Sequence, residues 1–554
     1  MIRHNLRLPS GLRMGALLSA IGLVAACTGA DGAKGDPGPQ GPVGSTPTIA
    51  PSSDAAPPVS SLATWEKALV GIGGRDRLAA LRSVRQTVRT VRSFSGESYD
   101  PHDPPQTASE GTMTILEDLA NDNLRIDTNR TVVAFGFGAK QTYRQTLRKE
   151  LGFLDGVESA FGAPGGPMGS DRLAALKKEQ RLLNPHRILR EALARPASVK
   201  TGPQALVDGV LHEVLEIESA TAPITLFVHP ATGHLAKART KESDPLHRDV
   251  TVEARYVDWT TSAGAIAFPR KVFLSVDGSI VHEETRDTFE PDAPTKAEDF
   301  SFPGGATPVH SAADALRGES RHQFHQVFGS IGIPLDGLQT AVTSTPIAPG
   351  VFHLTGGSHN SLLVEQSAGL VLVETPLYEE RSEAILKFLT DTFPTKKLTH
   401  VIVSHFHSDH SAGLRSFVPT GATIVVGESS LEFYREIFAA PSKIRPDALE
   451  KTPRQATFVG VPTGGSFTIA DATRPIGVHH VRTGHARDMV MVHAKNEQIV
   501  FAADIYSPGL PPFPPGPREL LRSIQEDHKL TVTTVAGAHG GTSTLAELVR
   551  IATP

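Results

Sequence analysis

The stretch His405-Phe-His-Ser-Asp-His410 places three imidazoles and one carboxylate within six residues. Metal binding is the chemistry that best explains so many nitrogen and oxygen donors together. The preceding run, Leu398-Thr-His-Val-Ile-Val403, is short, apolar and rich in β-branched residues, which predicts a buried strand that ends where the histidines begin. From such a junction the H-x-H pair can converge on one cation, while the D-H pair faces a second. The alternative is a histidine-rich surface loop.

Further polar residues follow this motif along the chain. His485 and His539 lie beside glycines, and Asp504 follows the apolar run Ile499-Val-Phe-Ala-Ala503. At a strand end or in a glycine-flanked turn, the backbone can approach a shared site closely. We therefore expect these three residues to join the motif.

On these residues, the C-terminal portion, 346–554, resembles the metallo-β-lactamase superfamily. The resemblance implies an α/β fold, an αββα sandwich with a two-metal groove along one sheet edge. It also implies the ligands: His405, His407 and His485 for one ion, Asp409, His410 and His539 for the other, and Asp504 as the bridge.

The expected chemistry is metal-dependent hydrolysis. Imidazole and carboxylate ligands suit two Zn²⁺ ions best, although iron or manganese also accept them. Two ions roughly 3.5–4 Å apart would generate a bridging hydroxide near neutral pH and polarise the oxygen of the scissile group. Asp409 would also orient the hydroxide, and Tyr506 is a candidate proton donor to the leaving group. The alternative for Tyr506 is a strand residue that packs outward.

Further positions can be compared with the family pattern. Antibiotic-hydrolysing members have cysteine or serine where this chain has Asp504, so the site is more similar to the thioesterase and lactonase branches. Glu374 stands where the family commonly has aspartate, which leaves its contact with the ligands open. His359 and Asn360 either line the groove or form a structural turn.

The N-terminus predicts export. Three arginines precede the apolar stretch Met14 to Ala26, which is too short for a membrane span but suits a signal peptide. It ends in Val24-Ala-Ala-Cys27, which resembles the bacterial lipoprotein signal. Cys27 is the only cysteine, so no intrachain disulfide can form. We expect residues 1–27 to be this signal and a lipid at Cys27 to anchor the protein in the cell envelope. Thr28, in place of aspartate after the cysteine, resembles lipoproteins that are sorted to the outer membrane. An ordinary signal peptide is the alternative.

Residues 28–61 are expected to form a tether. Glycine recurs at every third position from 29 to 44, as in collagen, and proline, serine and threonine stay frequent to residue 61. So short a repeat favours an extended spacer, with a trimerising stalk as the alternative.

Residues 62–305 predict an α+β domain. Helical segments such as Arg75–Arg82 come first, followed by strand-like runs such as Ile224–Val228. Lys271–Val276 and Ser279–Thr288 flank an Asp-Gly turn, which predicts an antiparallel hairpin in a curved sheet. This order is similar to the periplasmic lipoprotein-carrier half-barrel, which can shelter an acyl chain. The alternative is a structural domain that packs on the hydrolase and shapes its groove.

Residues 306–345 predict a helical connector, with one helix from Ala312 to Phe328. His322 and His325 lie three residues apart on it, without an acidic residue between them, so we expect them on the helix surface. An apolar content of 39% is enough for two cores. The net charge of −5 argues against nucleic acid as a partner.

Together these features predict a binuclear hydrolase that cleaves an ester, lactone, thioester or amide bond in the cell envelope. The expected substrate is a small or lipid-like molecule, and the oligomeric state is not indicated. One alternative is a β-lactamase that hydrolyses antibiotics. Another is a lipid-binding or lipoprotein-binding envelope protein.

Overall fold

The computed structural model describes residues 61–136, 138–160, 164–303 and 308–553. The predicted signal peptide, the lipid anchor at Cys27 and almost all of the predicted tether lie outside these residues. Within the described ranges, no helix has the length and apolar character needed to cross a membrane.

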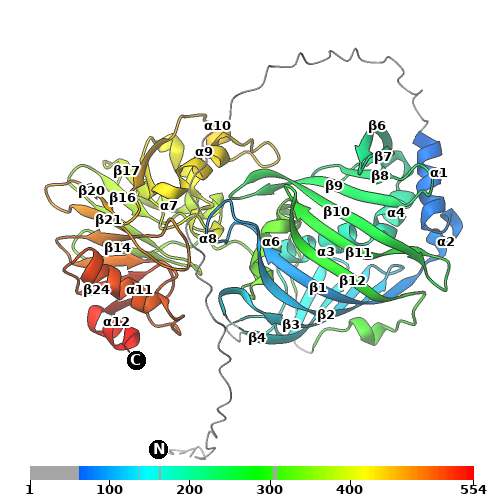
Figure 1. Cartoon of the computed structure of the whole chain (residues 1–554), viewed down its shortest axis with the longest axis horizontal. Coiled ribbons are helices and arrows are strands. Elements are labelled where there is room, and N and C mark those ends of the chain that lie inside the picture. Colours follow the sequence, from blue (N-terminus) through cyan, green and yellow to red (C-terminus); the bar gives the residue numbers. More distant parts are fainter. Residues whose placement is uncertain (1–60, 137, 161–163, 304–307, 554) are drawn as a thin grey trace, which may run out of the picture. The chain divides into compact units, whose positions relative to one another are not determined.

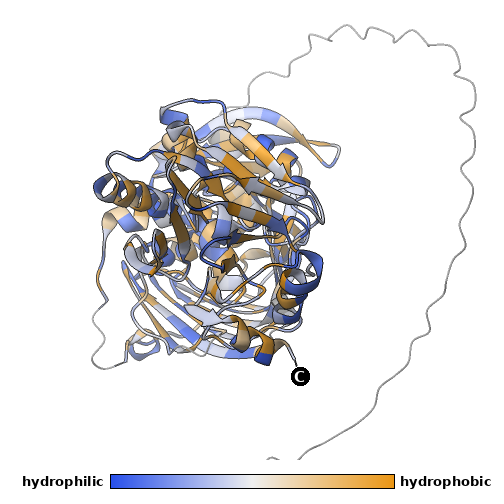
Figure 2. Ribbon diagram, turned by 90° about the vertical axis from the view of Figure 1, so that its left-hand side faces the viewer, coloured by the Kyte–Doolittle hydropathy of each residue, from blue (hydrophilic) through white to orange (hydrophobic). Residues whose placement is uncertain are grey.

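A 12-stranded antiparallel sheet, blue to green in Figure 1, dominates the N-terminal half. The strand order is β5-β4-β3-β2-β1-β12-β11-β10-β9-β8-β7-β6, so the first and last strands pair at the centre. Hydrophobic and hydrophilic residues are interleaved along the strands (Figure 2), as a sheet buried on one face requires. The strands are β1 (Ser83–Phe94), β2 (Gln106–Asp118), β3 (Asn123–Val132), β4 (Ala139–Arg148), β5 (Leu151–Val157), β6 (Val199–Val207), β7 (Val210–Ile217), β8 (Ile224–Val228), β9 (Leu235–Asp244), β10 (Arg248–Thr261), β11 (Ala267–Val276) and β12 (Ser279–Pro291).

Four helices accompany this sheet: α1 (Ser61–Ile72), α2 (Arg75–Ala80), α3 (Ser170–Leu183) and α4 (Pro185–Ala194). Helix α3 packs on the sheet through polar contacts, because the Tyr256 hydroxyl and the Arg286 guanidinium donate to carbonyls at its C-terminal end. Arg92 of β1 forms a two-pronged ion pair with Glu179 of α3. The predicted curved antiparallel sheet is confirmed, and its resemblance to the lipoprotein carrier stays a prediction.

The C-terminal region contains two sheets. The seven-stranded sheet has the order β13 to β19 and the six-stranded sheet the order β20 to β25. Apolar side chains of both sheets, such as Val371 and Val492, share one core. Their opposite faces pack against helices, as Ile385 and Leu548 illustrate. The predicted αββα sandwich is therefore confirmed.

The bounds of its strands are β13 (Thr343–Ala348), β14 (Val351–Thr355), β15 (Ser361–Glu365), β16 (Leu370–Val373), β17 (Leu398–Ile402), β18 (Thr423–Gly427), β19 (Thr457–Val461), β20 (Ser466–Ile469), β21 (Ile476–His480), β22 (Val490–Ala494), β23 (Ile499–Ala502), β24 (Thr534–Gly537) and β25 (Thr542–Thr544). The helices are α7 (Glu379–Thr392), α8 (Ser408–Ser411), α9 (Leu431–Ala439), α10 (Ala448–Lys451), α11 (Gly516–Arg522) and α12 (Leu545–Ala552).

The connector differs from its prediction. The expected single helix is two, α5 (Ala312–Ser320) and α6 (His322–Ser330), which are separated at Arg321. Arg321 is buried, and its charge is compensated by ion pairs with Glu379 and Glu380. The expected surface position of His322 and His325 is wrong, since both are buried and His322 Nδ1 lies 2.9 Å from Glu242 Oε1.

The sheet of the N-terminal half and the sandwich belong to one compact unit, 58–554. Arg248 of β10, for example, donates to the Ala412 carbonyl and lies 3.3 Å from the Asp447 carboxylate. The predicted boundaries at 305 and 345 remain predictions.

Candidate metal centre

Strand ends gather the candidate ligands, as the sequence predicted. His405 and His407 follow β17, a partly buried internal strand that pairs with β16 and β18 in parallel. Asp409 and His410 lie in the short helix α8 directly after them. The remaining three come from the six-stranded sheet: His485 precedes β22, Asp504 follows β23 and His539 follows β24.

The structure brings all seven predicted ligands together in two groups. Within each group the candidate ligand atoms all lie within 4.8 Å of one another. The first group is His405, His407, His485 and Asp504, and the second is His359, Asp409, His410 and His539. The division matches the predicted one, with His359 as an addition.

Asp504 links the two groups through its two carboxylate oxygens. Its Oδ2 lies 3.1 Å from His485 Nε2 and 3.6 Å from His405 Nε2. Its Oδ1 lies 2.9 Å from His410 Nε2 and 3.0 Å from His539 Nε2. The backbone of Asp504 has a φ of 51°, an unfavourable conformation that such sites often retain. This carboxylate is therefore placed to bridge two cations.

Acceptors behind the histidines set their tautomers. His407 Nε2 lies 2.8 Å from the Ser98 carbonyl, and His539 Nδ1 lies 3.1 Å from the Ser358 carbonyl. His410 Nδ1 lies against the Glu374 carboxylate. Since a carbonyl or carboxylate only accepts, each of these ring nitrogens donates, and the other nitrogen of each ring is directed at a carboxylate of the site. This is the outer support that metal-binding histidines usually have.

Burial and charge set the protonation states that a metal site needs. Burial lowers the pKa of His405 and of His359 to about 4, so both rings are neutral at neutral pH. Burial would raise the pKa of Asp409 and Asp504, but the adjacent His410 charge outweighs it and both pKa values lie well below the usual range. The neutral rings and the ionised carboxylates are in the states that metal ligands need, whereas the adjacent carboxylates outweigh burial and raise the pKa of His410 and His539, so these two rings must lose a proton when a cation binds.

Glu374, which stands where the family commonly has aspartate, contacts one of the candidate ligands. Its Oε2 accepts from His410 Nδ1 and its Oε1 accepts from the Ser404 amide at 2.7 Å. The side chain is fully buried, and the φ of Glu374 is 72°. The longer side chain therefore still reaches a ligand of the second group.

His359 and Asn360, which precede β15, have different roles. His359 Nε2 lies 3.0 Å from Asp409 Oδ2, so His359 belongs to the site. Asn360 donates from its side chain to the carbonyls of Gly537 and Gly540, and this holds the turn that carries His539. Both interpretations of this segment therefore hold, each for one residue.

Tyr506 is buried in the core, so the expectation that it packs outward is wrong. Its hydroxyl lies 2.9 Å from Ser543 Oγ, and Ser543 is not one of the predicted ligands. The donor role stays a prediction.

Two residues of the N-terminal half also reach the site, and sequence reasoning missed them. Glu97 is buried against His407 and Ser408, and Ser98 supplies the carbonyl behind His407. Neither stands in a recognisable motif, so only the tertiary structure reveals them.

The residues fit bound metal. Four buried ligand atoms have no hydrogen bond of good geometry: His407 Nδ1, Asp409 Oδ1, His410 Nε2 and Asp504 Oδ1. Polar atoms are rarely buried in this state, because an unsatisfied group costs about 1–3 kcal/mol. Cations at these atoms would satisfy them.

Comparison with known proteins finds a family and similar solved structures for the C-terminal region. Residues 354–542 match the family described as the Metallo-beta-lactamase superfamily. Similar solved structures include a metallo-beta-lactamase from Pontibacter korlensis, with 16% identity over 38% of this chain and 97% of that one and a TM-score of 0.31. The FIM-1 enzyme from Pseudomonas aeruginosa in its mono-zinc form is 17% identical over 38% and 93%, with a TM-score of 0.31. No curated protein matches the chain.

Proposed function

Because residues 354–542 belong to the metallo-beta-lactamase superfamily, whose members are usually metal-dependent hydrolases, we propose that this chain is a binuclear hydrolase. The observation that carries the proposal is the placement of Asp504. One of its oxygens faces two histidines of the first group, and the other faces two histidines of the second. A carboxylate so divided is suited to hold two ions side by side.

The donor set supports zinc as the first choice of metal. Its donors are imidazole nitrogens and carboxylate oxygens, which zinc accepts readily and which iron or manganese also accept. When bound, such ions lower the pKa of a coordinated water to about 7 and polarise a carbonyl oxygen.

The protein's own residues orient the ligands for this chemistry. Glu374 fixes the ring of His410, and the Ser98 carbonyl fixes the ring of His407. His359 holds the Asp409 carboxylate at 3.0 Å. We assign Asp409 the further role of orienting the attacking water.

The substrate we propose is an ester, lactone, thioester or amide of the cell envelope. Aspartate at position 504, where the resemblance places cysteine or serine in antibiotic-hydrolysing members, supports this choice over a β-lactam. We also propose attachment to the outer membrane through a lipid at Cys27, which would keep the enzyme near such substrates.

The test is the metal content of the purified full chain by elemental mass spectrometry, followed by a panel of chromogenic esters, lactones, thioesters and cephalosporins. About two metals per chain with turnover of one of the first three classes would support the proposal. Turnover of cephalosporins alone would favour the β-lactamase alternative. A chain that binds no metal after reconstitution would refute both.

A further inference from the structure

The segment that follows β1, Glu97 to Asp100, contacts the candidate metal centre from the other half of the chain. The Ser408 amide donates to Glu97 Oε1 at 3.0 Å, and the Ser408 hydroxyl donates to the same oxygen. Asp100 forms an ion pair with Arg487 at 3.0 Å. Glu97 is only 4% exposed, so its carboxylate is committed to this contact.

The second carboxylate oxygen of Glu97, Oε2, faces His407 without a hydrogen bond to it. Because His407 Nε2 donates to the Ser98 carbonyl, the lone pair of that ring is on Nδ1. Glu97 Oε2 lies 3.3 Å from Nδ1, and no hydrogen bond of good geometry joins them. A lone pair and an ionised carboxylate oxygen repel each other unless a proton or a metal cation lies between them. Glu97, His407 and Asp409 indeed form a third group of potential ligands.

We propose that Glu97 is a residue of the metal centre, supplied by the N-terminal half of the chain. This inference rests on the proposed function. Its carboxylate places an additional oxygen on the His407 side of the site and holds Ser408 at the start of α8, the helix that carries Asp409 and His410. The N-terminal region thereby becomes part of the site, not merely its neighbour.

The test compares Glu97→Gln with wild type and with Asp103→Asn, which removes an exposed carboxylate three residues after Asp100. Zinc content after dialysis against graded chelator and the melting temperature with and without zinc are measured on the full chain. We expect Glu97→Gln to release zinc at about tenfold to 100-fold lower chelator concentration. Its zinc-free melting temperature should stay at or above that of wild type, because the repulsion at His407 is removed. Asp103→Asn should behave as wild type.

A purely structural Glu97 gives the opposite pattern. Glu97→Gln would then lower the melting temperature equally with and without zinc and keep its chelator resistance, and this result would overturn the inference. If wild type itself binds no zinc, manganese or iron, the proposed function fails first, so the two failures are distinguishable.

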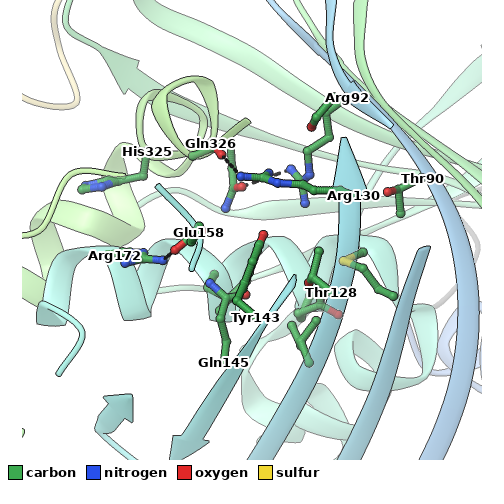
Figure 3. A pocket seen from close by; sticks show the side chains of 16 residues that line it. Thr90, Arg92, Thr128, Arg130, Tyr143, Gln145, Glu158, Arg172, His325 and Gln326 are labelled. Atoms are coloured by element: carbon green, nitrogen blue, oxygen red, sulfur yellow. Dashed lines mark hydrogen bonds and ion pairs between the residues drawn. The ribbon is translucent and has the colours of Figure 1, made fainter. Parts of the chain in front are cut away.

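A second, independent observation concerns a cavity of about 40 Å³ between β1 to β4 and helices α3 and α6. Arg92, Arg130 and Arg172 all line it, and Figure 3 shows Arg130 and Tyr143 extending into the same space. The side chains of Thr128 and His325 line it too.

The three arginines differ in their partners. Arg92 pairs with Glu179, and Arg172 pairs with Glu158 and Asp336. Arg130 is only 7% exposed, and among the described residues no carboxylate lies within ion-pair distance of it. It donates instead to the Gln141 side chain and to the Gly329 carbonyl, both at 2.7 Å.

Other groups at the cavity are also unsatisfied. The buried Thr128 hydroxyl and His325 Nδ1 have no hydrogen-bond partner in the described structure. A buried guanidinium without a countercharge costs several kcal/mol. We infer that this cavity binds a compact oxyanion, a phosphate or carboxylate group, that pairs with Arg130 and accepts from Thr128. A cavity of this size holds a small ion but no acyl chain.

The test is the melting temperature of the full chain against sodium phosphate and sodium acetate, with sodium chloride at equal ionic strength as the reference. Wild type should gain about 3 °C for each tenfold of the bound anion above its dissociation constant. Arg130→Met should show no gain with either anion. Arg89→Met, which removes an exposed arginine of β1, should keep the gain.

Two results would overturn the oxyanion site. One is an equal gain in wild type and Arg130→Met, which places the anion elsewhere, the metal centre included. The other is no gain in wild type with either anion together with a lower melting temperature of Arg130→Met, which makes Arg130 a structural residue.

Discussion

Glu374→Gln is expected to weaken metal binding about tenfold to 100-fold without unfolding the protein. Glu374 accepts two hydrogen bonds, one on each oxygen, from the Ser404 amide and from His410 Nδ1. Glutamine has the same shape but only one acceptor oxygen, so its NH₂ group must face one of these buried donors. An unsatisfied buried donor costs about 1–3 kcal/mol, and 1.4 kcal/mol corresponds to tenfold in affinity. The loss falls on His410, because the Ser404 amide is fixed by the backbone.

The assay is equilibrium dialysis of the full chain against graded chelator, with bound metal counted by elemental mass spectrometry. Glu365→Gln is the matched control, since Glu365 is a partly exposed carboxylate at the end of β15 that pairs with Lys396. The reasoning would be refuted if Glu374→Gln retained metal as wild type does while Glu365→Gln also did. A loss of metal accompanied by an unfolded circular dichroism spectrum would point to the fold instead.

Four further outcomes are expected. Asp504→Ala should lose metal and activity but keep its circular dichroism spectrum, because the sandwich cores do not depend on the site; full activity would contradict the bridging role. Lys178→Met should cost about 3–5 kcal/mol in urea unfolding followed by tryptophan fluorescence, because it leaves Glu242 buried without its ammonium partner. Burial opposes ionisation of Glu242, but Lys178 and His322 lower its pKa from 4.5 to about 2. The ionised carboxylate therefore adds about 3 kcal/mol to the free energy of unfolding above pH 4.5. This contribution should disappear as the pH falls towards 2. Cys27→Ala should move the protein from the membrane to the soluble fraction, and continued firm membrane binding would exclude the lipid anchor.

Local pattern was enough to predict much of the fold. The run before the histidines is a strand, β17, and the two segments around Asp277-Gly278 pair as antiparallel β11 and β12. Each of these predictions depends on periodicity and turn residues within a few positions. The predicted connector helix failed because Arg321 interrupts it to reach Glu379 and Glu380, which lie about sixty residues away. Sequence spacing carries no information on such a partner.

In the candidate site, too, residues with a local sequence signal could be predicted and residues placed by long-range contacts could not. The seven candidate ligands could be singled out because each stands in the histidine-rich motif, at a strand end or beside a glycine. His359 was given two interpretations because one histidine after glycines carries no periodic signal. Glu97 and Ser98 could not be identified, because they contact Ser408 and His407 across 311 and 309 residues of chain.

The short helix α8 explains why both halves of the chain matter to the site. It has only four residues, too few to be stable alone, yet it carries Asp409 and His410. Its position must therefore come from tertiary contacts. Glu97 holds its first residue from the N-terminal half, and Glu374 holds His410 from the sandwich. Loss of either carboxylate frees one end of a helix that has no stability of its own, so the geometry of the second group of ligands depends on both.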